Sequence, residues 1–170
     1  STTYNAFGEE TITAIEALNI IKDENFEEKS HIAGKLINNK LIKLKNKYPK
    51  IILDHRGSGC LHGIIINSSK FDEFLKPVMK LIPISFLKDD QAIKKIIVSS
   101  IIFHLYKNYN ILTYYGSNKD IPLKISPSVV VKEEQINYFF SSLETTLNLG
   151  LFKLVKNFVG NKFFKKFKLW

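Results

Sequence analysis

The 170-residue sequence has few of the residues that mark several common classes of protein. It has one cysteine, Cys60, which rules out an internal disulfide framework and a zinc site built from four thiolates. Its longest run of mainly apolar residues, 96–103, is much shorter than the ~20 residues that a membrane-spanning helix needs. No basic segment followed by an apolar segment opens the chain, so no secretory signal is visible and we expect a cytoplasmic protein.

Arginine is also scarce, although the chain is basic. Lysine and arginine together number 25 against 16 acidic residues, which gives a formal net charge of +9. Arg56 is the single arginine, so lysine supplies nearly all of the positive charge. Because paired hydrogen bonds to phosphates and guanine edges favour arginine over lysine, we expect no nucleic-acid partner.

The composition is otherwise that of a globular domain, with 45% hydrophobic and 24% charged residues. A chain of this length can bury a core without a metal or a disulfide. Residues 151–170 differ from the rest, because they hold six lysines, several aromatic residues and no acidic residue. We therefore divide the chain into a domain, residues 1–150, and a basic amphipathic tail, residues 151–170. The chain starts at Ser1 rather than at methionine, which indicates a processed product, an artificial start or a piece of a longer protein.

Helical spacing of apolar residues predicts several amphipathic helices. In residues 8–24, Ile12, Ile15 and Leu18 follow this spacing, and acidic residues in the first turn complement the helix dipole. The other helices are expected at residues 26–48, 91–108 and 132–147, with a weaker helical stretch at 70–88 that two prolines interrupt.

Short apolar segments bounded by glycine or proline predict strands. Residues 51–55 and 61–67 are expected to form a hairpin, because the glycines within residues 56–60 permit a tight reversal. Two further strands are expected at residues 111–115 and 123–125. Together these elements predict an α+β fold in which helices pack on a small, mostly antiparallel sheet.

Four stretches carry a resemblance to a known family. They are STTYNAF (residues 1–7), DHRGSGCLHG (54–63), ILTYYG (111–116), and LKISP followed by EEQI (123–136). In this order and spacing they resemble the C-terminal portion of class III aminotransferases of the ornithine and acetylornithine kind. The resemblance covers roughly residues 1–148 and implies the small C-terminal domain of a fold type I enzyme that uses pyridoxal 5′-phosphate (PLP).

The resemblance implies residues that bind the cofactor. In the family, a threonine of the first stretch binds the PLP phosphate of the neighbouring subunit. The corresponding residue is Thr3, with Thr2 as the second choice. Short hydroxyl and amide donors beside a helix start suit a phosphate. The same two residues also fit a disordered terminus, so both interpretations stay open.

Two further residues are implied to bind substrate. Lys124 stands where the family has an arginine that clamps the substrate carboxylate, and Arg56 matches the arginine of the family's hairpin. Lysine presents a point charge rather than a planar pair of donors, which argues against an ordinary α-amino acid as the amino donor. The alternatives are a solvated lysine at a strand edge and an arginine that supports the hairpin.

The resemblance also implies that the catalytic residues lie outside this sequence. The family's cofactor-anchoring lysine, the aspartate at the pyridine nitrogen and the phosphate-binding glycine loop all precede the portion resembled here. We therefore assign no catalytic residue. The implied function is amino-group transfer between an amine or amino acid and a carbonyl acceptor in a homodimer. PLP is then bound only with the upstream part or a partner subunit, and residues 1–170 alone are not catalytic.

His55 and His62, with Cys60 between them on the predicted hairpin, form the best candidate for a metal site. Alternation along the strands is expected to place the two histidines on different faces, and Asp54 is the one carboxylate nearby. We therefore assign no metal site. Because Cys60 lies in the family-like turn, we expect an inert thiol rather than a nucleophile.

The tail at residues 151–170 has no counterpart in the resemblance. Leu151, Leu154 and Phe158 share one side of a predicted helix, with lysines toward its edge. Such a segment packs on the domain or on a partner, or lies on an anionic membrane surface. It supports an alternative function, which is a non-catalytic scaffold or binding module that docks on a partner or an anionic membrane through this tail.

Overall fold

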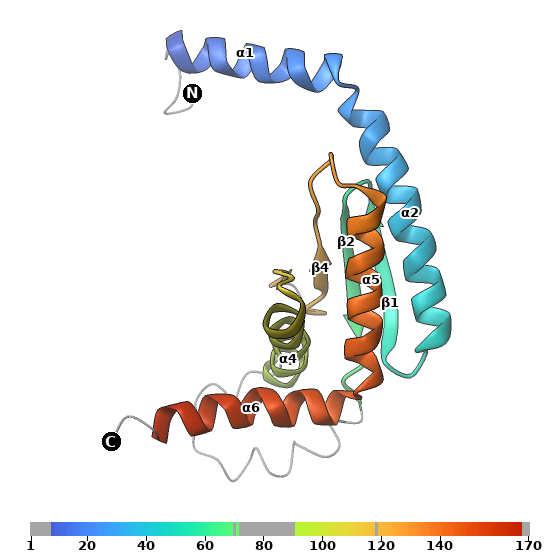
Figure 1. Ribbon diagram of the computed structural model, residues 1–170, viewed down its shortest axis with the longest axis vertical. Coiled ribbons are helices and arrows are strands. Elements are labelled where there is room, and N and C mark those ends of the chain that lie inside the picture. Colours follow the sequence, from blue (N-terminus) through green and yellow to red (C-terminus); the bar gives the residue numbers. More distant parts are fainter. Residues whose placement is uncertain (1–7, 70, 72–90, 118, 168–170) are drawn as a thin grey trace.

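The computed structural model describes residues 8–69, 71, 91–117 and 119–167, with side chains described up to residue 160. Helices and strands follow one another in the order α1, α2, β1, β2, α4, β3, β4, α5 and α6 (Figure 1). This arrangement confirms the α+β fold expected from the sequence. Thr2 and Thr3 lie outside the described residues, as does nearly all of the weak helical stretch predicted at 70–88.

The helices of the described residues begin and end close to the predicted positions. They are α1 (Gly8–Asp23), α2 (Phe26–Lys47), α4 (Ala92–Tyr109), α5 (Glu133–Asn148) and α6 (Leu151–Phe167). Local chemistry explains their ends. Asn110 adopts a left-handed conformation and closes α4, and the Gln135 side chain accepts a hydrogen bond from the Lys132 backbone N–H at the start of α5.

A four-stranded antiparallel sheet forms in the order β1-β2-β4-β3. Its strands are β1 (Ile52–Ser58), β2 (Leu61–Ile66), β3 (Tyr114–Tyr115) and β4 (Leu123–Ile125). The hairpin of β1 and β2 is confirmed, and β4 has the bounds predicted for it. The register of β1 shifts between Ile52 and Asp54, so Leu53 bulges out and is 59% exposed.

Two strand predictions were wrong in extent. Strand β1 continues through Arg56 to Ser58, because Gly57 stays extended and the reversal takes place at Gly59, whose φ is +53°. Arg56 therefore lies on a strand and not in the turn. Strand β3 is shorter than the predicted 111–115, because the Ile111 backbone N–H bonds to the Leu105 carbonyl and completes the end of α4 instead.

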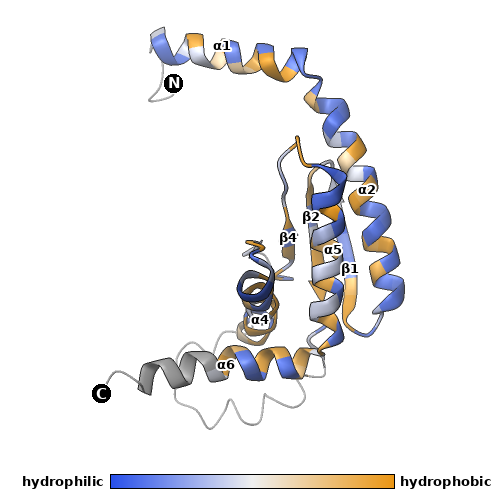
Figure 2. Ribbon diagram, viewed as in Figure 1, coloured by the Kyte–Doolittle hydropathy of each residue, from blue (hydrophilic) through white to orange (hydrophobic). Residues whose placement is uncertain are grey.

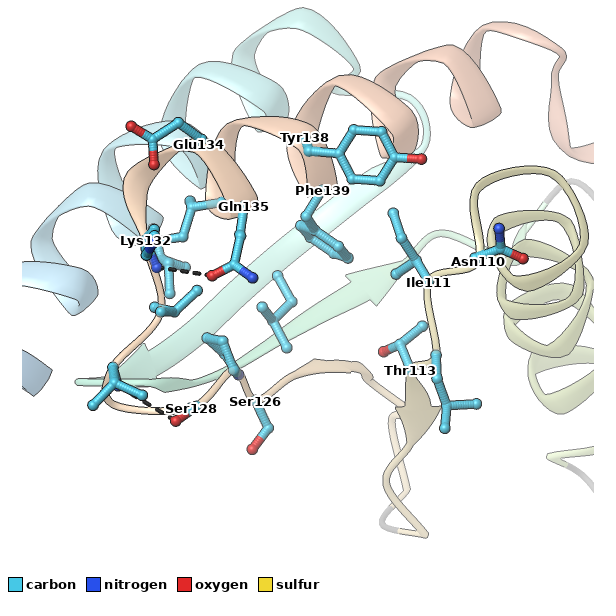
Figure 3. A pocket seen from close by; sticks show the side chains of 17 residues that line it. Asn110, Ile111, Thr113, Ser126, Ser128, Lys132, Glu134, Gln135, Tyr138 and Phe139 are labelled. Carbon is cyan, nitrogen blue, oxygen red and sulfur yellow. Dashed lines mark hydrogen bonds between the residues drawn. The ribbon is translucent and has the colours of Figure 1, made fainter.

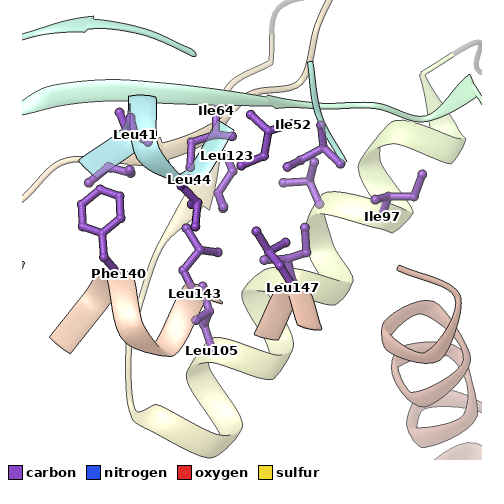
Figure 4. Packing of buried hydrophobic residues seen from close by; sticks show 14 of the residues in the cluster. Leu41, Leu44, Ile52, Ile64, Ile97, Leu105, Leu123, Phe140, Leu143 and Leu147 are labelled. Carbon is purple, nitrogen blue, oxygen red and sulfur yellow. The ribbon is translucent and has the colours of Figure 1, made fainter. Parts of the chain in front are cut away.

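The hydrophobic core lies on one face of the sheet, between the sheet and helices α2, α4 and α5 (Figure 4). The buried side chains labelled in Figure 4 are Leu41, Leu44, Ile52, Ile64, Ile97, Leu105, Leu123, Phe140, Leu143 and Leu147. Each belongs to the apolar stripe of a helix or to alternate positions of a strand. The helices therefore cover this face, and the side chains at the intervening strand positions point away from it.

Helix α6 packs against α4 and so extends the core. Leu154 is 1% exposed, and the Phe158 ring lies edge-on to Phe103 with ring centroids 5.6 Å apart. Phe152 stacks on Phe71 at 4.3 Å. Of the alternatives for the tail, the described part thus packs on its own domain. In the part of the chain that the structure describes, no helix has the length and apolar character needed to span a membrane.

Helix α1 stands apart from the sheet and makes its main contact with α2, the helix that follows it (Figure 1). None of its residues is buried. Apolar residues are distributed along it (Figure 2). Two of them, Ile12 and Leu18, are more than 60% exposed. Asn25, in a left-handed conformation, sets the change of direction between the two helices.

The tip of the β1–β2 hairpin rests directly on α2. A Cβ atom added to Gly34 would lie 2.7 Å from the Gly59 carbonyl oxygen, and one added to Gly59 would lie 2.4 Å from the Ser30 hydroxyl oxygen. Two backbones come this close only where side chains are missing on both. The Gly34–Gly59 contact therefore fixes where the hairpin sits relative to the helix.

We expect Gly34→Ala to lower the free energy of unfolding by about 1–3 kcal/mol, because the new methyl group meets backbone atoms that no side-chain rotation can move. Gly160→Ala, also inside a helix but with open space around it, is the matched control. It should raise the free energy of unfolding by up to about 1 kcal/mol through helix propensity alone. Urea denaturation of both variants measures the difference, and equal effects would contradict the close contact.

Candidate substrate-binding site

A row of four residues crosses the sheet on the face opposite the core. Arg56 of β1 pairs with Gly63 of β2, Gly63 pairs with Lys124 of β4, and Lys124 pairs with Tyr114 of β3. Directly paired residues share a face of a sheet. Their chain neighbours Ile64 and Leu123 belong to the buried core, so the row itself faces outward.

The two predicted substrate-binding residues meet in this row. Arg56 and Lys124 both line a cavity of about 460 Å³ on the outer face. Gly63 lies between them and has no side chain, and the Pro122 ring packs over it, since a Cβ atom added to Gly63 would lie 3.1 Å from Pro122 Cβ. Pro122 and Asp120 line it as well. The cavity is therefore lined by two cations and one carboxylate, with Pro122 between the cations.

An ion-pair network supports Arg56 from the side. Its Nε donates to Oδ2 of Asp54 at 3.1 Å, and the Lys45 ammonium of α2 donates to Oδ1 of the same carboxylate at 3.1 Å. Both hydrogen bonds lower the pKa of Asp54, and the one from Lys45 has the larger effect. The Arg56 side chain is nevertheless 72% exposed. Arg56 is thus braced by the hairpin and still open to a ligand, so its two interpretations are compatible.

Lys124 is held by the segment that leads into β3 and by an aromatic ring of that strand. Its backbone carbonyl accepts a hydrogen bond from the Thr113 hydroxyl. Its ammonium lies 6.0 Å from the centroid of the Tyr114 ring, within the range of a cation–π contact. Lys124 is half-buried rather than free in solvent. Lys124 is the middle residue of an inner strand rather than a lysine at a strand edge, and it has a defined position beside the cavity.

The backbone next to the cavity is strained. Ile121 has a φ of +46°, a conformation that β-branched residues rarely adopt, and it precedes Pro122, which further disfavours it. The Ile121 side chain is fully buried, which holds the strained backbone in place. Strain of this kind concentrates at ligand-binding sites. Here it positions Asp120 and Pro122 against the cavity.

His62 lies beneath the same cavity. It is 3% exposed, and its Nε2–H donates to the Gly59 carbonyl at 2.9 Å. Its Nδ1 is buried without a hydrogen-bond partner in the described residues. Burial lowers the pKa of His62, so the ring is neutral. The ring ties the hairpin turn to the strand that carries Gly63.

The expected separation of the two hairpin histidines was wrong. His55 pairs with Ile64, and His62 pairs with Gly57, so both histidines occupy the same face of the hairpin. Even so, nowhere in the described ranges do three histidine, cysteine or acidic residues gather as metal ligands do. Cys60 is a free thiol, half-buried, with its Sγ 3.9 Å from the Ser128 carbonyl oxygen.

A second cavity, of about 820 Å³, lies between α5 and the segments 110–113 and 125–131 (Figure 3). Its walls are mainly apolar, with Phe139 contributed by α5 and Ile111 by the segment that follows α4 (Figure 3). Ser126, Lys132 and Glu134 are among its polar lining residues, and Gln135 is already engaged at the start of α5. Its charged lining residues, Lys132 and Glu134, have opposite signs, so this cavity offers space for an apolar group but not two cations like Arg56 and Lys124.

Sequence reasoning named Arg56 and Lys124 as candidates but did not name the residues that surround them. Asp120, Pro122 and Tyr114 join the site through strand pairing, and they stand about 60 residues from the hairpin in the sequence. The Asp-Ile-Pro segment is a weak signal of a turn, and nothing in it indicates a left-handed isoleucine. No sequence motif marks the residues that line the second cavity either.

Comparison with known proteins identifies the fold. No family model matches the chain. A curated relative, an uncharacterised aminotransferase of Schizosaccharomyces pombe, is 42% identical over 66 residues, which are 36% of this chain and 14% of that protein. Its match is thus confined to a small part of both proteins.

Solved structures match most of the chain. A lysine aminotransferase from M. tuberculosis matches 81% of the chain with a TM-score of 0.58 and 15% identity. An S-selective transaminase from Arthrobacter sp. matches 78% with a TM-score of 0.57 and 22% identity. An acetylornithine aminotransferase from Elizabethkingia anophelis matches 78% with a TM-score of 0.55 and 22% identity.

The chain spans about a quarter of the length of these solved chains, since the matches cover 25%, 26% and 28% of them. The described helices and antiparallel sheet match the C-terminal α+β domain of aminotransferases. The resemblance read from four stretches of sequence is thereby confirmed at the level of the fold.

The neutral, buried His62 makes a testable contribution to the pH dependence of stability. Its pKa is lowered on folding, so the unfolded chain takes up a proton at a higher pH than the folded chain. Neutral His62 contributes fully to the free energy of unfolding above the ordinary histidine pKa of about 6.5. This contribution is lost as the pH falls from there toward the pKa of His62 in the folded chain. In the His62→Gln variant, the free energy of unfolding measured by urea denaturation should fall less steeply between about pH 7 and 5. An unchanged slope would contradict the assignment, whereas a residual slope is expected from His104, whose pKa burial also lowers.

Proposed function

We propose that this chain is the C-terminal small domain of a PLP-dependent class III aminotransferase, which moves an amino group between an amine or amino acid and a carbonyl acceptor. The observation that carries the proposal is the cavity shared by Arg56 and Lys124 in a chain with the fold of an aminotransferase segment. A homodimer and a cytoplasmic location belong to the same proposal.

In this proposal Arg56 and Lys124 hold the anionic end of the substrate. Both cations line the same cavity, whose wall between them is formed by Pro122 over Gly63. Asp54 and Lys45 orient Arg56, and Tyr114 orients Lys124. These residues bind and align the substrate, while proton transfer to and from its carbon belongs to residues outside this chain.

PLP, when bound, supplies the carbonyl group that takes up the amino group and the ring system that stabilises the resulting carbanion. The described residues fit a supporting role toward it, because they provide an anion-binding face but no buried lysine beside a cavity. Thr3, with Thr2 as the second choice, is proposed to bind the cofactor phosphate through its hydroxyl and backbone N–H. Neither threonine is assigned a catalytic step.

The direct test is to purify the protein at its natural length and to record its intact mass and its absorbance spectrum. A mass well above 19.6 kDa, together with a PLP absorbance band that borohydride treatment shifts, supports the proposal. A mass near 19.6 kDa without any PLP band overturns it and leaves a non-catalytic scaffold as the function.

Substitution of the threonines tests the cofactor contact. Thr3→Val should weaken PLP binding about tenfold or more, because it removes one hydrogen bond to a charged phosphate. Thr2→Val is the matched control, since it changes the same side chain one position away. PLP dissociation constants of both variants at natural length provide the comparison. Equal weakening in the two variants, or none in either, would contradict the assignment of Thr3.

A further inference from the structure

We infer that helix α6 docks this protein on an anionic membrane surface, through the side that the helix turns away from the core. The partner is a bilayer that contains phosphatidylserine, and the contact is made with its headgroups. The inference goes beyond the proposed function and does not rest on it, because none of the α6 residues that the structure describes lines the cavity of Arg56 and Lys124.

The two sides of α6 differ in chemistry. The inner side packs on α4, where Leu154 is 1% exposed and the Phe158 ring lies edge-on to Phe103. The outer side carries Lys153 and Lys156, which are both exposed. Packing on α4 fixes the orientation of the helix about its axis, so these two lysines face solvent.

Apolar side chains stand among the lysines of α6. Hydrophobic and hydrophilic residues alternate along its described part (Figure 2). Phe152 is 53% exposed although its ring stacks on Phe71, and Val159 is 40% exposed. Positions 152, 156 and 159 follow one another at helical spacing, so Lys156 lies between two exposed apolar residues on one side of the helix. This order suits the surface of a bilayer, where ammonium groups meet the headgroups while nearby apolar groups leave water.

The charge of this segment is unbalanced. Residues 151–170 hold six lysines and no acidic residue, so they supply +6 of the net charge of +9. In the part of the chain that the structure describes, neither Lys153 nor Lys156 forms an ion pair. Lys107 of α4 is a further exposed cation near α6, with its ammonium 5.8 Å from the centroid of the Phe103 ring. A cluster of about four to eight lysines on a helix is typical of segments that bind phosphatidylserine.

The inner side of α6 is already used in the core, so docking depends on charge rather than on deep insertion. Lysine presents a point charge, which suits the diffuse negative charge of a lipid surface, whereas the planar fork of arginine suits a single phosphate or carboxylate. Salt screens exposed charges that lie more than about 8–10 Å apart at moderate ionic strength. Docking of this kind is therefore reversible and weakened by salt.

Vesicle sedimentation tests the inference on the protein at natural length. Vesicles of phosphatidylcholine are compared with vesicles that also contain about 30% phosphatidylserine, at low salt and at about 0.5 M salt. At low salt we expect the partition coefficient to be at least about tenfold higher for the vesicles with phosphatidylserine, and at high salt we expect this difference to vanish. Equal binding to the two kinds of vesicle, or no binding to either, would overturn the inference.

Paired variants locate the contact on α6. Lys153→Gln combined with Lys156→Gln should lower the partition coefficient about tenfold or more. Lys35→Gln combined with Lys43→Gln removes the same charge from two exposed positions of α2 and is the matched control. Urea denaturation checks that both double variants stay folded. Equal losses of vesicle binding in the two double variants would show that the overall charge attracts the protein rather than α6, which overturns the inference.

A competitor distinguishes a lipid surface from an acidic protein partner. Polyglutamate is added to the vesicle-bound protein at the same concentration of negative charge as the vesicles present. Retention on the vesicles supports the inference, because a bilayer surface also takes up apolar groups. Release of the protein shows a preference for an acidic polypeptide and overturns it. Vesicle binding by a protein that binds no PLP would contradict the proposed function and leave this inference standing.

Discussion

The burial of Leu123, Ile125 and Ile64 on one face of the sheet determines what the other face can do. Each of these side chains is at most 6% exposed, and such burial contributes about 1.5–3 kcal/mol per residue. Because strand side chains alternate, Lys124 and Gly63 must then face outward. A slip of one residue would bury the lysine and expose the leucine. The weak contact between Lys124 and Tyr114, worth about 0.5–1 kcal/mol at an exposed site, cannot set this register by itself.

The sequence allowed the helices to be located well and the site only in part. Helical periodicity is a local property, so the bounds of α2 and α5 follow from neighbouring residues. The length of β1 depends on whether Gly57 bends or stays extended, and the partner strand decides that. Arg56 and Lys124 were found through family resemblance. Their cavity partner Asp120 was not, because strand pairing and the buried Ile121 bring it there.

Arg56 illustrates how one side chain contributes to the fold and also lines the candidate site. Its ion pair with Asp54, which Lys45 shares, links strand β1 to helix α2. Exposed ion pairs add little to stability, at most about 1 kcal/mol. The value of this network therefore lies in orientation, since it fixes a long side chain that would otherwise sample many rotamers. The Gly34–Gly59 contact does the same for the backbone, because it allows the hairpin one position on the helix.

The bulge at Leu53 has a consequence for the behaviour of the protein at high concentration. Strand β1 forms one edge of the sheet, and such an edge presents backbone groups to which a strand of another molecule can add. The bulge twists this edge, and the charged side chains of Asp54 and Arg56 follow directly after it. Flat edges recruit further strands, whereas twisted and charged edges repel them. The irregularity therefore protects the protein against aggregation through its longest strand.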